Sequence, residues 1–349
     1  MIRSRAVVLS SLSLLLIVVL IVSCCVGAVS ISAAEFFSLV GYKTGLSAAQ
    51  LYSDQQAAVL LHIRLPRVSL GALVGAALGV SGAAIQGLFR NPLAEPGLIG
   101  ISSGATLFTV LMIVLGAGFF KVISGAMGFY ALSISAFAGA CFTTILVYRL
   151  AVNNGKTVIT TLLLCGIGIN ALAGALTGLL TYMATDEQLR TITFWSLGSL
   201  GGASWETVVL IAPFVFIPVF ILPFFSKSLN ALALGEAQAV HMGINVVKLK
   251  RVIMLLATIA VGASVSVAGM IGFIGLVVPH VLRISFTSDH RLVLPGAAIA
   301  GAALLTMADL VARTIVMPAE LPIGILTALI GTPVFLYMVI SERNKNKQL

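Results

Sequence analysis

Residues that could do chemistry are few in this sequence, and their spacing assembles no catalytic centre. The chain has four histidines and four cysteines, and none of them follows the spacing of a metal site. No segment resembles the Gly-Lys-Ser/Thr loop that cradles nucleotide phosphates. We therefore predict a chain that is not an enzyme, has no catalytic residue or metal site, and binds no cofactor itself. The histidines and cysteines are His62, His241, His280, His290, Cys24, Cys25, Cys141 and Cys165.

Arginines offer a different chemistry, which is the recognition of carboxylates. Arg64 and Arg67 flank a Leu-Pro pair, and Arg313 follows Asp309 by one helical turn. A guanidinium makes bidentate, charge-assisted bonds to carboxylates, so these arginines could dock an acidic partner. The alternative is snorkelling at a membrane interface, which needs no partner.

These residues belong to a chain with the composition of a membrane protein. It is 59% hydrophobic and 9% charged, whereas soluble domains carry about 25% charge. Its mean hydropathy is +1.13. The net charge of +9 could suit nucleic acid, but the cations lie at the ends of apolar runs, where the positive-inside rule places them. We therefore expect contact with membrane lipid and none with nucleic acid.

Ten candidate spans predict an all-α polytopic membrane protein, with residues 1–349 forming one transmembrane domain. The first run could be a signal peptide, but its length of about 23 residues exceeds the usual signal core and favours a retained span. Residues 252–282 hold 31 residues without a charge, too many for one span and few for two. The second crossing there must be short and irregular, or use later residues. The spans are 6–28, 68–89, 97–116, 124–148, 158–182, 208–225, 252–268, 270–286, 292–312 and 322–341.

Charge sets the orientation of these spans. With both ends inside, fourteen of the 20 Lys and Arg residues face the cytoplasm and six face outward, in agreement with the positive-inside rule. A polar, helix-prone segment at 226–251 then lies on the cytoplasmic side, where it presents a surface to something soluble. The six outward cations are Lys43, Arg64, Arg67, Lys121, Arg190 and Arg313.

Two glycine-rich and proline-rich segments could either pack helices or line a pathway. Gly71, Gly75, Gly79 and Gly82 make a smooth helix face, for which close helix packing is the commoner meaning. The segment from Gln86 to Gly104 contains Asn91-Pro92 and breaks the helix near the cytoplasmic side. Such a break suits either a gate or a tight turn. We name Gly82, Gln86, Asn91 and Pro92 as candidate pathway or gate residues.

Several long motifs, in this order along the chain, resemble the permease family of bacterial ABC importers for iron–siderophore, haem and cobalamin. The resemblance runs from about residue 57 to residue 340. The motifs are Arg64 to Arg67, Gln86 to Gly104, Gly272 to His280, Asp289 to Arg291, Ala308 to Arg313 and Glu320 to Gly324.

The resemblance implies a type II ABC importer permease with ten spans, in the bacterial inner (cytoplasmic) membrane. It implies a homodimer with a central pathway, two cytoplasmic ATPase subunits that use ATP and Mg, and a periplasmic substrate-binding protein. In this family, arginines placed like Arg64, Arg67 and Arg313 pair with glutamates of the binding protein.

The resemblance also makes the segment 226–251 a coupling loop, whose short helices sit in a groove of the ATPase. Leu234 could anchor in an apolar pocket, while Glu236 and Gln238 could bond polar groups. The alternative is an ordinary amphipathic cytoplasmic helix. The candidate coupling residues are Leu234, Gly235, Glu236, Ala237, Gln238, Ala239, Met242 and Gly243.

The segment from Asp186 to Trp205 resembles the haem branch of the family, which predicts haem (hemin) as the cargo. Arg190, Phe194 and Trp195 are the candidate contacts, although Arg190 could instead pair with Asp186 at i,i+4. Ferric siderophore and cobalamin remain alternative cargoes. An ion-coupled secondary transporter is the third reading, and it would need buried ionisable groups such as Asp309.

Overall fold

Helices account for nearly all of the computed structural model, which describes residues 4–46, 50–116, 128–153, 156–316 and 319–346. Seven helical segments are long and apolar enough to cross a membrane, and three apolar helices are shorter. Each falls on one of the ten predicted spans, so the predicted span order is confirmed. The first residues of span 124–148, and the predicted charge positions Arg3, Lys121 and Lys347, lie outside the described residues.

The ten helices have the following bounds. The long segments are α1 (Arg5–Cys25), α4 (Leu65–Phe89), α7 (Ala131–Ala151), α8 (Ile159–Tyr182), α10 (Trp205–Ile221), α13 (Val246–Ala268) and α15 (His290–Thr314). Helix α4 continues from α3 (Asp54–Val59) through the π-helical turn η1 (Leu60–Arg64). The shorter ones are α5 (Ile101–Leu115), α14 (Ile274–Ser285) and α16 (Ile323–Asn346), of which residues 323–337 are apolar.

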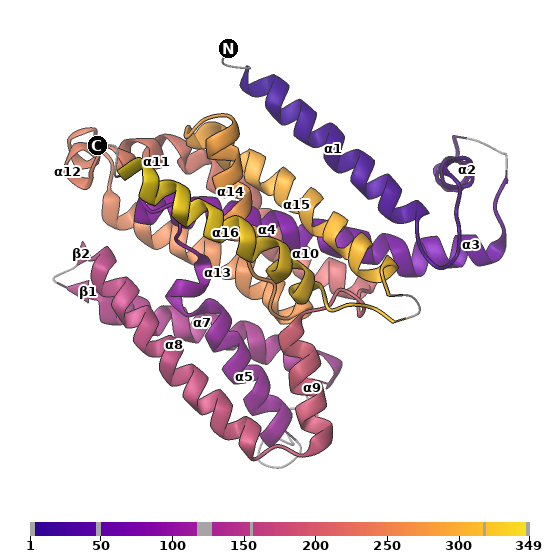
Figure 1. The fold of residues 1–349 in the computed structure, drawn as a ribbon, viewed down its shortest axis with the longest axis horizontal. Helices are drawn as coiled ribbons and strands as arrows, with labels where there is room; N and C mark the ends of the chain where they lie inside the picture. The colour runs from indigo at the N-terminus through magenta and orange to yellow at the C-terminus, as the bar shows by residue number, and fades with distance from the viewer. Residues whose placement is uncertain (1–3, 47–49, 117–127, 154–155, 317–318, 347–349) are drawn as a thin grey trace.

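Short elements join these helices at both ends of the molecule. Strands β1 (Val152–Asn153) and β2 (Lys156–Thr157) pair antiparallel, with Val152 opposite Thr157. The short helices are α2 (Ala33–Lys43), η2 (Pro96–Ile99), η3 (Gly128–Tyr130), α9 (Asp186–Leu197), η4 (Leu222–Phe225), α11 (Ser226–Ala233) and α12 (Glu236–His241). In Figure 1, α11 and α12 lie at the left end of the molecule, and α2 and α3 lie at the right end.

Helix α4 runs through the middle of the protein, and its glycines explain how closely its neighbours approach. A Cβ atom added at Gly75 or Gly79 would clash with backbone carbonyls of α15, at Gly301 and Ala297 respectively. One at Gly82 would clash with the carbonyl of Gly275 in α14. The glycine face is therefore a helix-packing face, and a pathway role for Gly82 stays a prediction. Small residues permit this contact where lipid offers no hydrophobic drive.

The uncharged stretch after Arg251 forms two helices separated by an irregular segment. Helix α13 ends at Gly269, whose φ of 69° is left-handed, and α14 begins after Phe273, with φ 68°. Helix α14 has only 12 residues, and at about 1.5 Å per residue it spans about 18 Å of a hydrocarbon core about 30 Å thick. The structure therefore has the predicted short second helix, preceded by an irregular segment.

Candidate functional site

Helix α9 is held rigidly at the end of the molecule opposite α11. Thr185 and Gln188 form a capping box at its first turn. The Gln188 amide also donates to the carbonyl oxygens of Ile113 (3.1 Å) and Val114 at the end of α5. At its other end Gly198 has a φ of 71°, and its carbonyl accepts from the Ile323 amide at 3.2 Å. These contacts fix the direction in which the side chains of α9 point.

A hollow of about 460 Å³ lies between α9 and the end of α13. Arg190, Phe194 and Trp195 all line it, so the structure brings together the three residues predicted to contact cargo. Arg190 makes no ion pair with Asp186 among the described residues. The guanidinium is thus exposed beside aromatic rings, an arrangement that suits a flat, apolar ligand with carboxylate groups.

A larger cavity of about 820 Å³ adjoins this hollow, because its wall continues from Trp195 to Ser196 and from Gly269 to Met270. Burial raises the pKa of the Glu95 carboxyl, while a hydrogen bond from the Phe273 backbone opposes that rise. The lining is otherwise mainly apolar or small, and its residues include Glu95, Gly97, Ser102, Met270, Phe273, Gly324 and Pro333. Sequence reasoning missed these residues, although the Gly-rich break at 269–275 pointed to this place.

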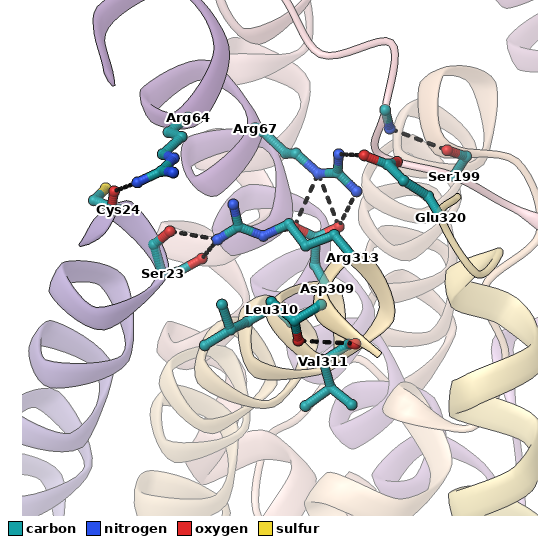
Figure 2. Close-up of polar contacts among 12 residues, drawn as sticks. Ser23, Cys24, Arg64, Arg67, Ser199, Asp309, Leu310, Val311, Arg313 and Glu320 are labelled. Atoms are coloured by element: carbon teal, nitrogen blue, oxygen red, sulfur yellow. Dashed lines mark hydrogen bonds and ion pairs between the residues drawn. The ribbon is translucent and has the colours of Figure 1, made fainter. Parts of the chain in front are cut away.

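The three predicted docking arginines, Arg64, Arg67 and Arg313, lie near one another (Figure 2). Arg67 donates through Nε and Nη2 to the carboxylate of Asp309 at 2.9–3.0 Å and through Nη1 to Glu320 at 2.7 Å. Arg313 lies 3.7 Å from Asp309 and donates to Ser23 in α1. This network joins α1, α4, α15 and the segment before α16.

Arg64 is equally occupied, with bonds from Nη1 to the carbonyls of Cys24 and Cys25 at 2.7 and 2.8 Å. Only 3% of Arg64 and 9% of Arg67 is exposed. This geometry favours a structural role for both, and their docking role stays a prediction. Asp309 is paired with Arg67 and Arg313, so the structure gives it no feature of a proton carrier.

The segment 226–251 forms α11, α12 and the first turn of α13. Turns at Gly235 (φ 129°) and Gly243 (φ 80°) bound α12. Leu234 and Met242, predicted as coupling residues, are 67% and 62% exposed, and Val240 between them is 58% exposed. We call these three side chains the apolar patch.

Other predicted coupling residues have internal partners. Glu236 accepts from Lys250 Nζ at 2.7 Å, which ties α12 to α13. Ala239 is fully buried within the protomer, and its part in the coupling surface stays a prediction. Ala237 and Gln238 are exposed, as a partner surface requires.

The candidate gate residues form a tight turn at the end of α4. Arg90 has a left-handed φ of 51°, and the Asn91 side chain accepts from the Leu93 amide at 2.9 Å. Gln86 is buried and bridges to the carbonyl of Leu276 in α14 at 3.1 Å. Asn91 and Pro92 line neither of the cavities described above. The structure thus shows a turn, and a gating role for it stays a prediction.

Comparison with known proteins identifies the class of protein that this fold and these sites define. The FecCD transport family matches residues 15–341, so the chain belongs to that family, whose members here are permease subunits of ABC importers. A hemin transport system permease, HmuU, of Yersinia pestis is 47% identical over 288 residues, covering 82% of this chain and 84% of that protein.

Two further relatives support the same class. A vitamin B12 import permease, BtuC, of Citrobacter koseri is 38% identical over 335 residues, covering 96% of this chain and 94% of that protein. A solved metal-chelate type ABC transporter in an inward-facing conformation has a TM-score of 0.82 and 32% identity. It covers 95% of this chain and 98% of that one. The chain is therefore a multi-pass ABC importer permease, and the ATPase of such an importer is a separate subunit.

Proposed function

We propose that this permease moves haem from a periplasmic binding protein across the bacterial inner membrane into the cytoplasm. The observation that carries the proposal is the hollow in which Arg190 lies with Phe194 and Trp195. A flat macrocycle would stack on the aromatic rings, and a propionate would pair with the guanidinium. The 47% identity to a hemin permease supports the same cargo.

Energy would enter through the apolar patch on the α11–α12 side. Its side chains offer hydrophobic contact to two ATPase subunits that hydrolyse Mg-bound ATP, and the Lys250–Glu236 ion pair holds α12 against α13. Exposed apolar groups at a membrane protein's polar end mark a protein contact. On this reading α11 and α12 form the coupling loop.

A second copy of the chain would pack against α8, and the two copies together would enclose the pathway. Only 17% of its apolar window is buried in the protomer. Gly168, Gly174 and Gly178 have no described atom within 4 Å of an added Cβ. Glycines four apart are a helix-dimerisation pattern, so this open face supports a homodimer.

Uptake by proteoliposomes carrying the complete importer tests the cargo. We expect wild type to import haem in preference to a ferric siderophore or cobalamin. Arg190→Ala should lower haem uptake about tenfold, which corresponds to losing one charge-assisted pair. Lys43→Ala, an exposed cation at the same end, is the matched control. Equal uptake of all three cargoes would contradict haem as the cargo, and equal losses in both variants would contradict the contact between Arg190 and the cargo.

Co-purification tests the coupling loop separately. Leu234→Asp should reduce retention of the ATPase because it places a charge in a hydrophobic contact. Lys227→Asp is the control, because it changes an exposed residue of α11 that lies outside the apolar patch. ATPase retention that is equal in wild type and Leu234→Asp would refute the contact.

A further inference from the structure

The side chain of Asn230 in α11 bonds two consecutive residues at the start of α15. Its amide nitrogen donates to Asp289 Oδ1 at 2.7 Å. Its amide oxygen accepts from the His290 backbone at 3.0 Å and lies 2.7 Å from His290 Nδ1. Asp289 is also the N-cap of α15, where it accepts from the Arg291 amide at 2.9 Å.

This arrangement fixes the chemistry of both side chains. The Asp289 carboxylate only accepts, so the nitrogen of the Asn230 amide must face it and the oxygen must face His290. His290 Nδ1 must therefore carry a proton and donate to Asn230. The other ring nitrogen, Nε2, is buried and has no hydrogen-bond partner among the described residues. The ring is thus oriented entirely from the α11 side.

The oriented ring presses on the last turn of α4. A Cβ atom at Gly87 would lie 2.5 Å from His290 Nε2 and 3.3 Å from Leu229 Cδ2. Helices α11 and α15 therefore meet α4 at one glycine that has no room for a side chain. Leu229, fully buried, adds an apolar contact to the polar one.

The turn beside Gly87 leads directly into the break that precedes the large cavity. The Arg90 amide donates to the Gly87 carbonyl, and the Asn91 amide donates to the Gln86 carbonyl at 3.1 Å. Glu95, five residues past Arg90, lines the cavity. Packed and hydrogen-bonded groups thus connect α11 to the cavity wall, and networks of this kind can carry coupling between distant sites.

We propose that Asn230 and His290 are positioning residues that transmit movement of the coupling helices to the α4 turn at residues 86–95. Their role is to make α11, the start of α15 and the end of α4 move together. The inference rests on the proposed coupling function of α11 and α12, and it adds the route by which that movement reaches the pathway.

The test measures ATP hydrolysis and cargo uptake in the same reconstituted importer. Asn230→Ala should keep the ATPase bound and hydrolysing while cargo imported per ATP falls about fivefold or more, the range of ordinary coupling energies. Asn245→Ala is the matched control, because it removes an asparagine cap of α13 in the same loop without contacting α15. A wild-type ratio of uptake to hydrolysis in Asn230→Ala would overturn the proposal.

A pair of variants tests the contact with α4. His290→Asn keeps a side-chain donor for Asn230 but removes the atoms that face Gly87, and Gly87→Ala adds volume at the same point. Each alone should lower uptake per ATP, and the double variant should recover part of the loss because the added methyl group occupies the vacated space. If the losses of uptake per ATP in the two single variants simply add in the double variant, the proposed contact between His290 and Gly87 is refuted.

Failure of the proposed function gives a different result. The ratio is measured with whichever of haem, a ferric siderophore or cobalamin the wild-type importer takes up, so a wrong cargo is detected before any variant is compared. If α11 and α12 do not bind the ATPase, Leu234→Asp retains it in full. Both results differ from the one that would overturn the present inference, which is a wild-type ratio of uptake to hydrolysis in Asn230→Ala.

Discussion

At the residue scale, the ion pair between Arg67 and Asp309 shows how a charge is kept inside this protein. The side chains are 10% and 3% exposed, and three donor–acceptor contacts of 2.9–3.0 Å join them. Transferring a charged side chain from water into the protein interior costs several kcal/mol. The attraction within a well-aligned ion pair offsets that cost only while both partners are present.

We expect Arg67→Ala to lower the free energy of unfolding by about 3–5 kcal/mol, because it leaves the Asp309 carboxylate buried without its main partner. Thermal unfolding of the purified protein in detergent measures the loss. Lys43→Ala, an exposed change, should leave the melting temperature as in wild type.

Replacing both partners separates a structural role from a docking role. Arg67→Met combined with Asp309→Leu should recover most of the lost stability, since apolar residues of similar volume can replace a buried pair. A stable Arg67→Ala protein with weakened affinity for the binding protein would instead favour docking.

Sequence reasoning named these arginines but could not see their partners. Arg67 and Asp309 are 242 residues apart, and no local sequence pattern predicts such a contact. Arg64 bonds backbone carbonyls of α1, which carry no sequence signal at all. By contrast Arg190, Phe194 and Trp195 lie within two turns of one helix, so a resemblance confined to one short segment could name all three.

At the element scale, glycines divide into two groups by what surrounds them. Gly75 and Gly79 in α4 touch the backbone of α15, whereas Gly174 in α8 has no described atom within 4 Å of an added Cβ. The same residue type therefore has opposite sensitivity to substitution on the two helices.

We predict that Gly79→Ala destabilises the protomer by about 1–3 kcal/mol, because the added methyl group overpacks a close helix contact. Gly174→Ala should be neutral, or stabilising by up to about 1 kcal/mol through helix propensity. Melting temperatures of the two variants, compared at equal detergent concentration, give the result. Equal destabilisation by both substitutions would refute the assignment of α4 as the packed helix.

The elements themselves were largely predictable. Apolar runs and the distribution of Lys and Arg gave ten spans in the observed order, because in lipid a helix must satisfy its own backbone. An irregular segment between α13 and α14 was expected, because residues 252–282 are too many for one span and few for two. Its geometry was not, since Phe273 adopts a left-handed φ that no residue-type rule assigns to phenylalanine.

At the scale of the whole molecule, α8 is the least buried of the long spans. Substituting Gly174→Leu and Gly178→Leu should therefore weaken a homodimer while leaving the fold of each protomer intact. Native mass spectrometry of the permease in mild detergent measures the monomer fraction, and thermal unfolding reports on the protomer. Leu172→Ala, a change on the same helix, is the control. A dimer fraction as in wild type would place the interface elsewhere.

The shortness of α14 has an electrical consequence. Phe273, the residue before this helix, lines the cavity of about 820 Å³. If water fills that cavity, the transmembrane voltage falls across a thinner insulating layer. Moving one negative charge into a cell interior at −100 mV costs about 2.3 kcal/mol. A cargo with a net charge of −2 would meet twice that work, whatever the length of the helix. Part of the free energy of ATP hydrolysis would then be used to move negative charge against the membrane potential.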